Sequence, residues 1–184
     1  MITADEIIHL QRQTSDYYET EILKSKLADL RAKRRPFYLT LEEFEEILRW
    51  KLGSQYGRQK KRRSANTDEV IRRVTGLALE IKHPDMEYEI ELRIGILCAL
   101  RGVGIPVASA VLALVFPESY AVIDFRVWRQ LFGDSERGFS VSDYKRYLKA
   151  LDDLADQLTW PIQEIDHAIW EYDRRYYGTA ESPA

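Results

Sequence analysis

Residues 105–116, IPVASAVLALVF, constrain the fold more than any other stretch because they are apolar almost all round. A helix without a polar face has no side to turn toward water, so this stretch predicts a central helix that other helices bury. It is much shorter than the ~20 apolar residues that a membrane-spanning helix needs. The first residues do not show the basic start and apolar core of a signal peptide. We therefore expect a cytoplasmic protein with no membrane partner.

The rest of the chain shows apolar residues at helical spacing and no strand-like alternation of useful length. Capping residues such as Thr40 and Ser140 mark helix starts, and proline or glycine residues mark the ends. The expected helices run over about 3–34, 40–52, 67–82, 85–100, 105–116, 125–132, 140–158 and 160–177. The pattern predicts an all-α protein of about eight helices.

Several side chains are expected to face the core. On the third helix these are Val70, Ile71, Val74, Leu77, Ala78 and Ile81, and on the last helix Trp170, Tyr172 and Tyr176. Trp50 and Trp128 are also expected there, because large aromatic side chains bury a large area. Cys98 is the single cysteine, which excludes an internal disulfide and a cysteine-based metal site and suggests a small buried hydrophobe.

Basic residues are concentrated in two runs although the net charge is −3. The runs 31–35 and 58–63 together hold nine of the 27 lysines and arginines. Because only the local patch matters for phosphate contact, an acidic protein can still present a basic face. The alternative is that both runs are solvated helix ends and loops. The candidate nucleic-acid contacts of the second run are Arg58, Lys60, Lys61, Arg62 and Arg63.

Two glycines, Gly102 and Gly104, precede the apolar helix and predict a sharp turn, since glycine adopts positive φ without steric cost. The next helix begins at about Ile105, and its unpaired N–H groups and positive dipole end point out of the turn. Such an N-terminus can hold a phosphate group without any side chain. Pro106 suits the first helical turn, where its missing N–H is no loss. Gly102, Val103, Gly104 and Ile105 are therefore candidate phosphate contacts.

The turn and its second helix resemble the helix-hairpin-helix DNA-binding motif, L-x-G-V-G-x-x-x-A-x-x-x-L. The matching residues are Leu100, Gly102, Val103, Gly104, Ala108 and Leu112. Further along, residues 120–133 resemble the segment of the helix-hairpin-helix DNA glycosylases that ends in V-D-x-x-V-x-R. There Asp124, Val127 and Arg129 match in register. The resemblance covers about residues 40–160 and implies double-stranded DNA, damaged or intact, as the partner.

In that family the aspartate is catalytic, so the resemblance implies this role for Asp124. The early helix at 44–58 is similar to the family's first helix, where Gln-containing residues fill the gap left by a flipped base, and Gln55 and Tyr56 lie at about that place. Strand-cutting relatives carry a lysine where this chain has Pro106, which excludes lyase activity by that route. The iron–sulfur cluster of some relatives needs four cysteines and is excluded. We expect no cofactor, although the resemblance allows a structural K⁺ or Na⁺ at the hairpin.

These residues also have purely structural interpretations. Aspartate is among the best N-cap residues, so Asp124 can also cap the helix that follows it. Arg126 and Arg129 lie three residues apart on one helix face and can contact phosphates or pair with acids such as Glu118. The three histidines are far apart in the sequence without ligand spacing, so no histidine metal site is expected.

The chain is thus divided into a helical extension (1–36), a helical domain similar to a DNA glycosylase (37–178) and a disordered tail (179–184). Our first hypothesis is a DNA N-glycosylase without lyase activity, active in base-excision repair, in which Asp124 assists hydrolysis of the base–sugar bond. The second is a non-catalytic DNA-binding module that kept this scaffold. The third is an interaction protein in which the hairpin is only a tight turn. Neither the excised base nor the oligomeric state is readable from the sequence.

Overall fold

The computed structural model describes residues 3–10, 17–133 and 138–178. Within these ranges the fold contains helices and no strand, which confirms the all-α prediction. The α-helices are α1 (Ala4–Leu10), α2 (Tyr17–Lys33), α3 (Leu41–Leu52), α4 (Lys60–Arg63), α5 (Asp68–Glu80), α6 (Met86–Leu97), α7 (Ile105–Val115), α8 (Phe125–Phe132), α9 (Val141–Leu158) and α10 (Ile162–Tyr176). A short 3-10 helix, η1 (Gly53–Gly57), follows α3 directly.

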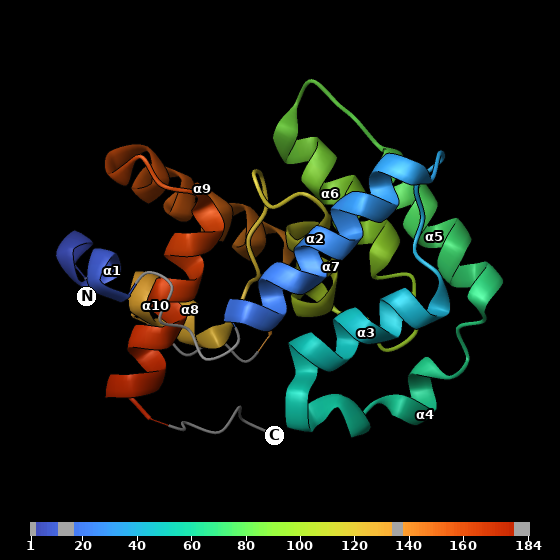
Figure 1. Cartoon of the computed structure of the whole chain (residues 1–184), viewed down its shortest axis with the longest axis horizontal. Coiled ribbons are helices and arrows are strands. Elements are labelled where there is room, and N and C mark those ends of the chain that lie inside the picture. The colour runs from blue at the N-terminus through green and yellow to red at the C-terminus, as the bar shows by residue number, and fades with distance from the viewer. Residues whose placement is uncertain (1–2, 11–16, 134–137, 179–184) are drawn as a thin grey trace.

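Helix α7 lies at the centre of the molecule, as its apolar sequence predicts. Every residue from Val107 to Val115 is buried. Helices α2, α3 and α6 pack against it, while α1, α8 and α9 gather around α10 in the other half (Figure 1). Contacts between α6 and α9 join the two halves, and the buried apolar side chains form one continuous cluster. Burial of α7 therefore organises both halves around one core.

The N-terminal segment forms two helices where the sequence suggested one. Helix α1 packs against α10, whereas α2 packs against α7 and α3. The buried side chains of both helices belong to the common core; they are Ile7, Leu10, Leu23 and Leu27. The predicted extension 1–36 therefore has no core of its own in the described residues.

Helix starts lie where the capping residues predict them. Thr40 and Ser140 form capping boxes at α3 and α9, in which each side chain accepts a hydrogen bond from the backbone of the third helical residue. Thr67, Asp85 and Asp124 cap α5, α6 and α8 in the same way, by accepting backbone hydrogen bonds. These short-range signals set the helix boundaries.

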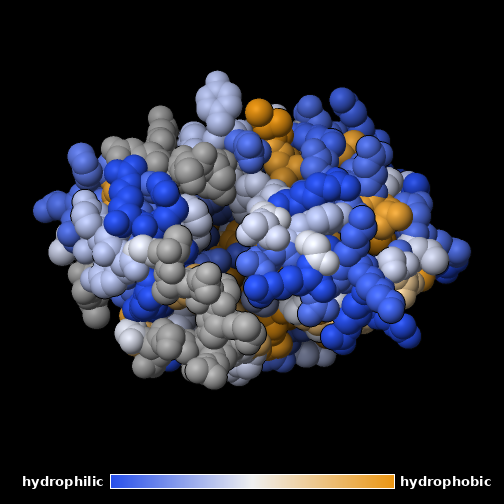
Figure 2. Space-filling view, turned by 90° about the horizontal axis from the view of Figure 1, so that it is seen from below, coloured by the Kyte–Doolittle hydropathy of each residue, from blue (hydrophilic) through white to orange (hydrophobic). Residues whose placement is uncertain are grey.

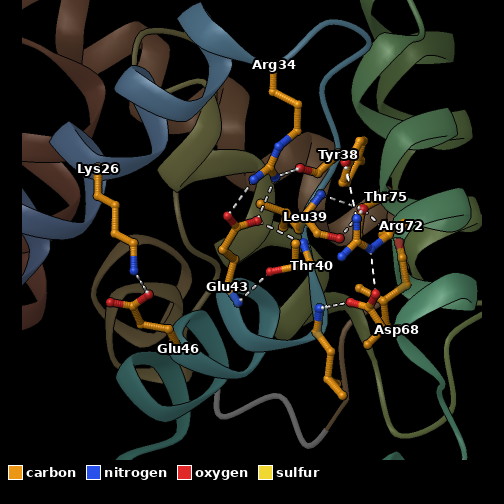
Figure 3. A network of polar contacts seen from close by, with 12 residues as sticks. Lys26, Arg34, Tyr38, Leu39, Thr40, Glu43, Glu46, Asp68, Arg72 and Thr75 are labelled. Carbon is orange, nitrogen blue, oxygen red and sulfur yellow. Dashed lines mark hydrogen bonds and ion pairs between the residues drawn. The ribbon is translucent and has the colours of Figure 1, made fainter.

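The start of α3 is fixed by a polar network that joins α2, α3 and α5 (Figure 3). Arg34 makes two hydrogen bonds of 2.8 Å to the carboxylate of Glu43. Burial by itself would raise the pKa of Glu43, but hydrogen bonds from Arg34 and Thr40 lower it below its ordinary value. The Thr75 hydroxyl accepts a hydrogen bond of 3.0 Å from the backbone N–H of Leu39. The network fixes the direction in which α3 leaves this corner.

Replacing Thr75 by Val is expected to lower the free energy of unfolding by about 1–3 kcal/mol, because it leaves the buried N–H of Leu39 without an acceptor. Urea unfolding measures the change. Ser25 is exposed on α2, so Ser25→Ala is expected to stay within about 0.5 kcal/mol of the parent and serves as control. Equal stability of Thr75→Val and Ser25→Ala would contradict the role of this hydrogen bond.

Three of the side chains expected in the core are exposed instead. Val70 and Leu77 are 42% and 58% exposed, because α5 turns Ile71, Thr75 and Ala78 inward. The hydroxyl of Thr75 bonds the backbone of Leu39, so the inward face of α5 includes a polar residue that a pattern of apolar residues leaves out. Tyr176 at the end of α10 is 68% exposed. The prediction was correct for Trp128, which is buried.

No helix in the described part of the chain is both long and apolar enough to span a bilayer.

Candidate functional site

The link between α7 and α8 runs through the interior, and side chains from three helices satisfy its backbone. Because a buried backbone group without a partner is costly, these bonds specify one conformation of the link. They run from Tyr144 Oη to Ala121 O (2.9 Å), from Ile123 N to Ser109 Oγ (3.1 Å), from Tyr147 Oη to Val122 O (3.1 Å), from Val122 N to Asp166 Oδ2 (3.1 Å) and from Gln163 Nε2 to Tyr120 O (3.2 Å). The link ends at Asp124 and so fixes its position.

Asp124 is both a helix cap and part of a pocket wall. Its Oδ1 accepts a hydrogen bond of 3.0 Å from the backbone N–H of Arg126, which caps α8. Its Oδ2 lies 3.1 Å from Nζ of Lys51, at the end of α3. The side chain of Asp124 is 20% exposed and that of Lys51 is 11% exposed. The capping role therefore leaves one carboxylate oxygen for the pocket.

A pocket of about 410 Å³ opens between α3 and η1 on one side and α8 and α10 on the other. Its size falls in the range of small-molecule sites, which is about 300–1,000 Å³. The lining residues are Trp50, Lys51, Leu52, Gly53, Ser54, Gln55, Val122, Asp124, Arg126, Asp166, His167 and Trp170. Two indole rings and two carboxyl groups thus line one cavity. The cavity therefore has room for a planar group that stacks on one of the indole rings.

Trp50 reaches this pocket although the sequence assigned it to the core. Its indole N–H donates a hydrogen bond of 2.9 Å to Thr20 Oγ1 on α2, and part of its surface lines the cavity. Trp170, also expected to face inward, lines the opposite side from α10. Both rings are partly buried and packed against the core, so their faces toward the cavity are held in place.

Asp166 is the second carboxyl group of the pocket, and it is almost entirely buried. Burial raises the pKa of Asp166 to about 7. Hydrogen bonds from Tyr147 and from the Val122 N–H, and the charge of Lys51, oppose this rise, whereas the charge of Asp124 adds to it. The pocket therefore holds two carboxyl groups in different surroundings. Burial also raises the pKa of Tyr147 well above its ordinary value.

Asp166 is expected to make stability depend on pH. An acid whose pKa is higher in the folded state binds more protons there, so stability falls as the pH rises from about 4 to about 7. Above this window the penalty is on the order of 4 kcal/mol, which corresponds to a pKa that folding raises from 3.8 to about 7. In Asp166→Asn this penalty is absent, so the variant gains stability relative to the parent between pH 4 and 8. Urea unfolding across this range tests it, and parallel curves would contradict the assignment.

Gln55 and Tyr56 lie in η1 in different surroundings. Gln55 lines the pocket, and its Oε1 is buried with no hydrogen-bond partner among the described residues. The ring of Tyr56 contacts the guanidinium of Arg63, 4.8 Å from the ring centre, and its hydroxyl donates to the carboxylate of Glu45. Gln55 therefore has an unused, buried acceptor in the pocket wall, whereas Tyr56 is held by its neighbours.

The turn between α6 and α7 has the backbone that its glycines predict. Gly102 has a φ of +75°, and Gly104 is the N-cap of α7. A Cβ at Gly102 would lie 2.7 Å from Cγ of Arg63, so glycine is required there for close approach as well. As in every helix, the first N–H groups of α7 have no carbonyl one turn earlier. They make this turn a candidate seat for an anion.

The basic run packs directly against this turn. Arg63 lies beneath Gly102, and Asn66, three residues after the run, donates a hydrogen bond of 2.9 Å to Arg101 O and accepts one of 3.0 Å from Arg101 N. Gln59 and Arg62 line a second pocket of about 350 Å³ together with the turn. Two candidate phosphate-binding elements, far apart in sequence, are thus adjacent. The segment 53–63 also reaches the first pocket, which its beginning lines.

Four of the five basic candidates in this run are exposed, and the fifth is not. Arg58, Lys60, Lys61 and Arg62 face solvent, whereas Arg63 is only 3% exposed beneath Gly102. The expectation that Arg63 contacts DNA is therefore corrected, because its guanidinium packs against Tyr56 inside the protein. Helix α4 lies at the lower right of Figure 1. Figure 2 views the molecule from below and shows many hydrophilic residues on its right half, which is the side of α4.

Arg126 and Arg129 pair with an acid rather than presenting free charges. Both contact the buried carboxylate of Asp173 on α10, at 3.1 Å and 2.7 Å. The sequence left two alternatives for these arginines, phosphate contact and pairing with an acid such as Glu118. They pair with an acid, but it is Asp173 and not Glu118. Because these guanidinium groups neutralise a buried charge, the structure does not support them as DNA contacts.

Within the described residues, no group of three or more histidine, cysteine, aspartate and glutamate side chains is arranged to hold a metal ion. Comparison of the chain with protein-family models, with curated proteins and with solved structures finds no match.

Proposed function

We propose that this protein binds double-stranded DNA through the α6–α7 turn and the exposed basic residues of 58–62. We further propose that the pocket beside Asp124 receives a base that has left the duplex. The observation that carries the proposal is the segment 53–63, whose beginning lines the Asp124 pocket and whose end packs against the α6–α7 turn. A duplex held at the turn would thus lie next to a cavity with aromatic walls.

The chemistry that fits this pocket is hydrolysis of the bond between a base and its sugar. Departure of the base leaves positive charge on the sugar, which a fixed carboxylate stabilises. Asp124 is fixed by its cap hydrogen bond and by Lys51, and the same carboxylate can orient the attacking water. Unstacking a base costs a few kcal/mol and least for a damaged or mispaired one, so such bases enter first. Gln55 is placed to contact the entering base or the gap it leaves.

A second candidate function is DNA binding without catalysis. The ion pair between Asp124 and Lys51 favours it, because a carboxylate that is already paired and capping a helix is in part satisfied within the protein. Binding would then depend on the turn and the basic residues alone. In that case no base is released from any duplex.

The test is a panel of duplexes, each carrying one damaged or mispaired base, incubated with the purified protein. Abasic sites are revealed by strand cleavage with alkali. Samples without alkali are analysed in parallel to detect strand cleavage by the protein itself, because Lys51 places an amine at the pocket. Release of at least one base supports the glycosylase. Salt-sensitive binding without release supports the binding module, and absence of binding at low salt rejects both.

A further inference from the structure

We propose that Asp166 and Tyr147 form a positioning pair that holds Asp124 in place. The presence or absence of one proton on this pair decides whether Lys51 pairs with Asp124 alone or also interacts with Asp166. Tyr147 does not line the pocket, and Asp166, which does line it, is assigned a positioning role within the protein and no contact with the reacting atoms. Both residues act on Asp124 through the buried link 120–123. The structural part of this proposal stands without any activity, and only its kinetic part rests on the proposed function.

The hydrogen-bond geometry limits where that proton can be. Tyr147 Oη contacts both Asp166 Oδ1 and, at 3.1 Å, Val122 O, but a hydroxyl has only one hydrogen to donate. If Asp166 is neutral, its O–H donates to Tyr147, and Tyr147 donates to Val122 O. Asp166 Oδ2 meanwhile accepts from the Val122 N–H at 3.1 Å. Both backbone groups of Val122 are then satisfied.

Ionisation of Asp166 breaks this arrangement. The Tyr147 hydrogen is then attracted to the carboxylate, and the buried carbonyl of Val122 loses its donor. The new negative charge of Asp166 also attracts Lys51, whose ammonium group is already paired with Asp124. Val122 is two residues before Asp124. Ionisation of Asp166 therefore has two effects on Asp124: it loosens the link that ends there, and it draws Lys51 partly away from the Asp124 carboxylate. Burial, which raises the pKa of Asp166 to about 7, places this change near neutral pH.

Other charged and titratable groups face the same region. They are Lys51 from α3, Asp124 and Arg126 at the start of α8, Tyr144 and Tyr147 from α9, and His167 from α10. Arg126 is paired with Asp173, and burial raises the pKa of Tyr144 well above its ordinary value. His167 needs a control, because histidine side chains ordinarily titrate in the same pH range as the proposed change.

The experiment follows the side-chain NMR signals of Asp124 and Lys51 between pH 5 and 9 in the full chain, with four variants. In the parent, both signals are expected to move in step with the Asp166 carboxyl near pH 7. In Asp166→Asn, whose amide donates to Tyr147 and whose oxygen accepts from Val122, both signals are expected to stay at their low-pH positions. In Tyr147→Phe and Asp166→Leu they are expected to be displaced at every pH. His167→Gln is the control and is expected to retain the movement.

Two results would overturn the proposal. One is an unchanged movement in Asp166→Asn that disappears in His167→Gln, which would assign the change to the histidine. The other is a pair of Asp124 and Lys51 signals that keep their parent positions in Tyr147→Phe. If Asp166→Leu fails to fold, the other three variants still decide the question.

If base release is found, the same variants separate positioning from simple stability. The parent rate is expected to fall above pH 7, whereas Asp166→Asn keeps the low-pH rate within about twofold across the range. A fall of equal size in both would contradict the positioning role and leave the proposed function intact. Absence of release from any duplex would reject the glycosylase but would not affect the NMR result.

Discussion

Replacing Asp124 by Asn is expected to slow base release roughly 100- to 1,000-fold, because the amide cannot stabilise the positive charge that develops on the sugar. Asparagine is as good an N-cap as aspartate, so α8 keeps its start and the fold is retained. Duplex affinity is expected to stay within about twofold, since the proposed phosphate contacts lie elsewhere. Single-turnover rates on a duplex that the parent cleaves measure the loss.

Asp85 provides a matched control for this change. It caps α6 by accepting hydrogen bonds from Glu87 N and Tyr88 N, and it does not line the pocket. Asp85→Asn therefore repeats the same chemical substitution at another helix start, and its rate is expected to match the parent. If Asp124→Asn also released bases at the parent rate, Asp124 would be a helix cap and nothing more.

Replacing Arg58, Lys60, Lys61 and Arg62 by Gln is expected to remove most of the duplex affinity at moderate salt. Each phosphate contact adds about 0.9 to the slope of log affinity against log salt, so loss of four contacts makes the slope shallower by roughly 3 to 4. Fluorescence anisotropy with a labelled duplex at several salt concentrations measures both quantities. All four side chains are exposed, so the fold is expected to be unaffected.

A pair of charges elsewhere tests whether position matters. Lys33 and Arg35 belong to the other basic run and are also exposed; Lys33 is the last residue of α2, whose end lies well above α4 in Figure 1, and Arg35 follows it in the sequence. Lys33→Gln with Arg35→Gln is expected to change the salt slope little, whereas Lys60→Gln with Lys61→Gln reduces it by about 2. Equal losses in the two pairs would mean that binding depends on total charge and that no basic face exists.

Features that depend on neighbouring residues were predictable from the sequence. The caps Thr40, Asp85 and Ser140 lie at helix starts because their side chains bond backbone groups two or three residues later. The burial of α7 was predictable because its composition allows no polar face. The positive φ of Gly102 follows from the turn between two helices.

Asp124, Gln55 and Arg126 were candidate site residues in the sequence, but the other groups of the pocket were not predictable, since they come from distant segments. No sequence rule links Lys51 to Asp124. Lys51 reaches the carboxylate because the network around Arg34 and Glu43 sets the direction of α3. Asp166 lies in a helix that reads as an ordinary amphipathic one, and only packing shows that it is buried against Tyr147. The burial of Arg63 likewise depends on its contact with Gly102, which is 39 residues away in the sequence.

The most direct test of the proposed site is a comparison of two duplexes by NMR, one fully paired and one with a single mismatched base. Both are expected to shift the backbone amides of 102–105 and of 58–62 with one common affinity. Only the mismatched duplex, whose base leaves the stack more easily, is expected to shift the indole N–H signals of Trp50 and Trp170 as well. If the indole signals do not respond, or respond equally to both duplexes, no unstacked base enters the pocket and the central claim is wrong.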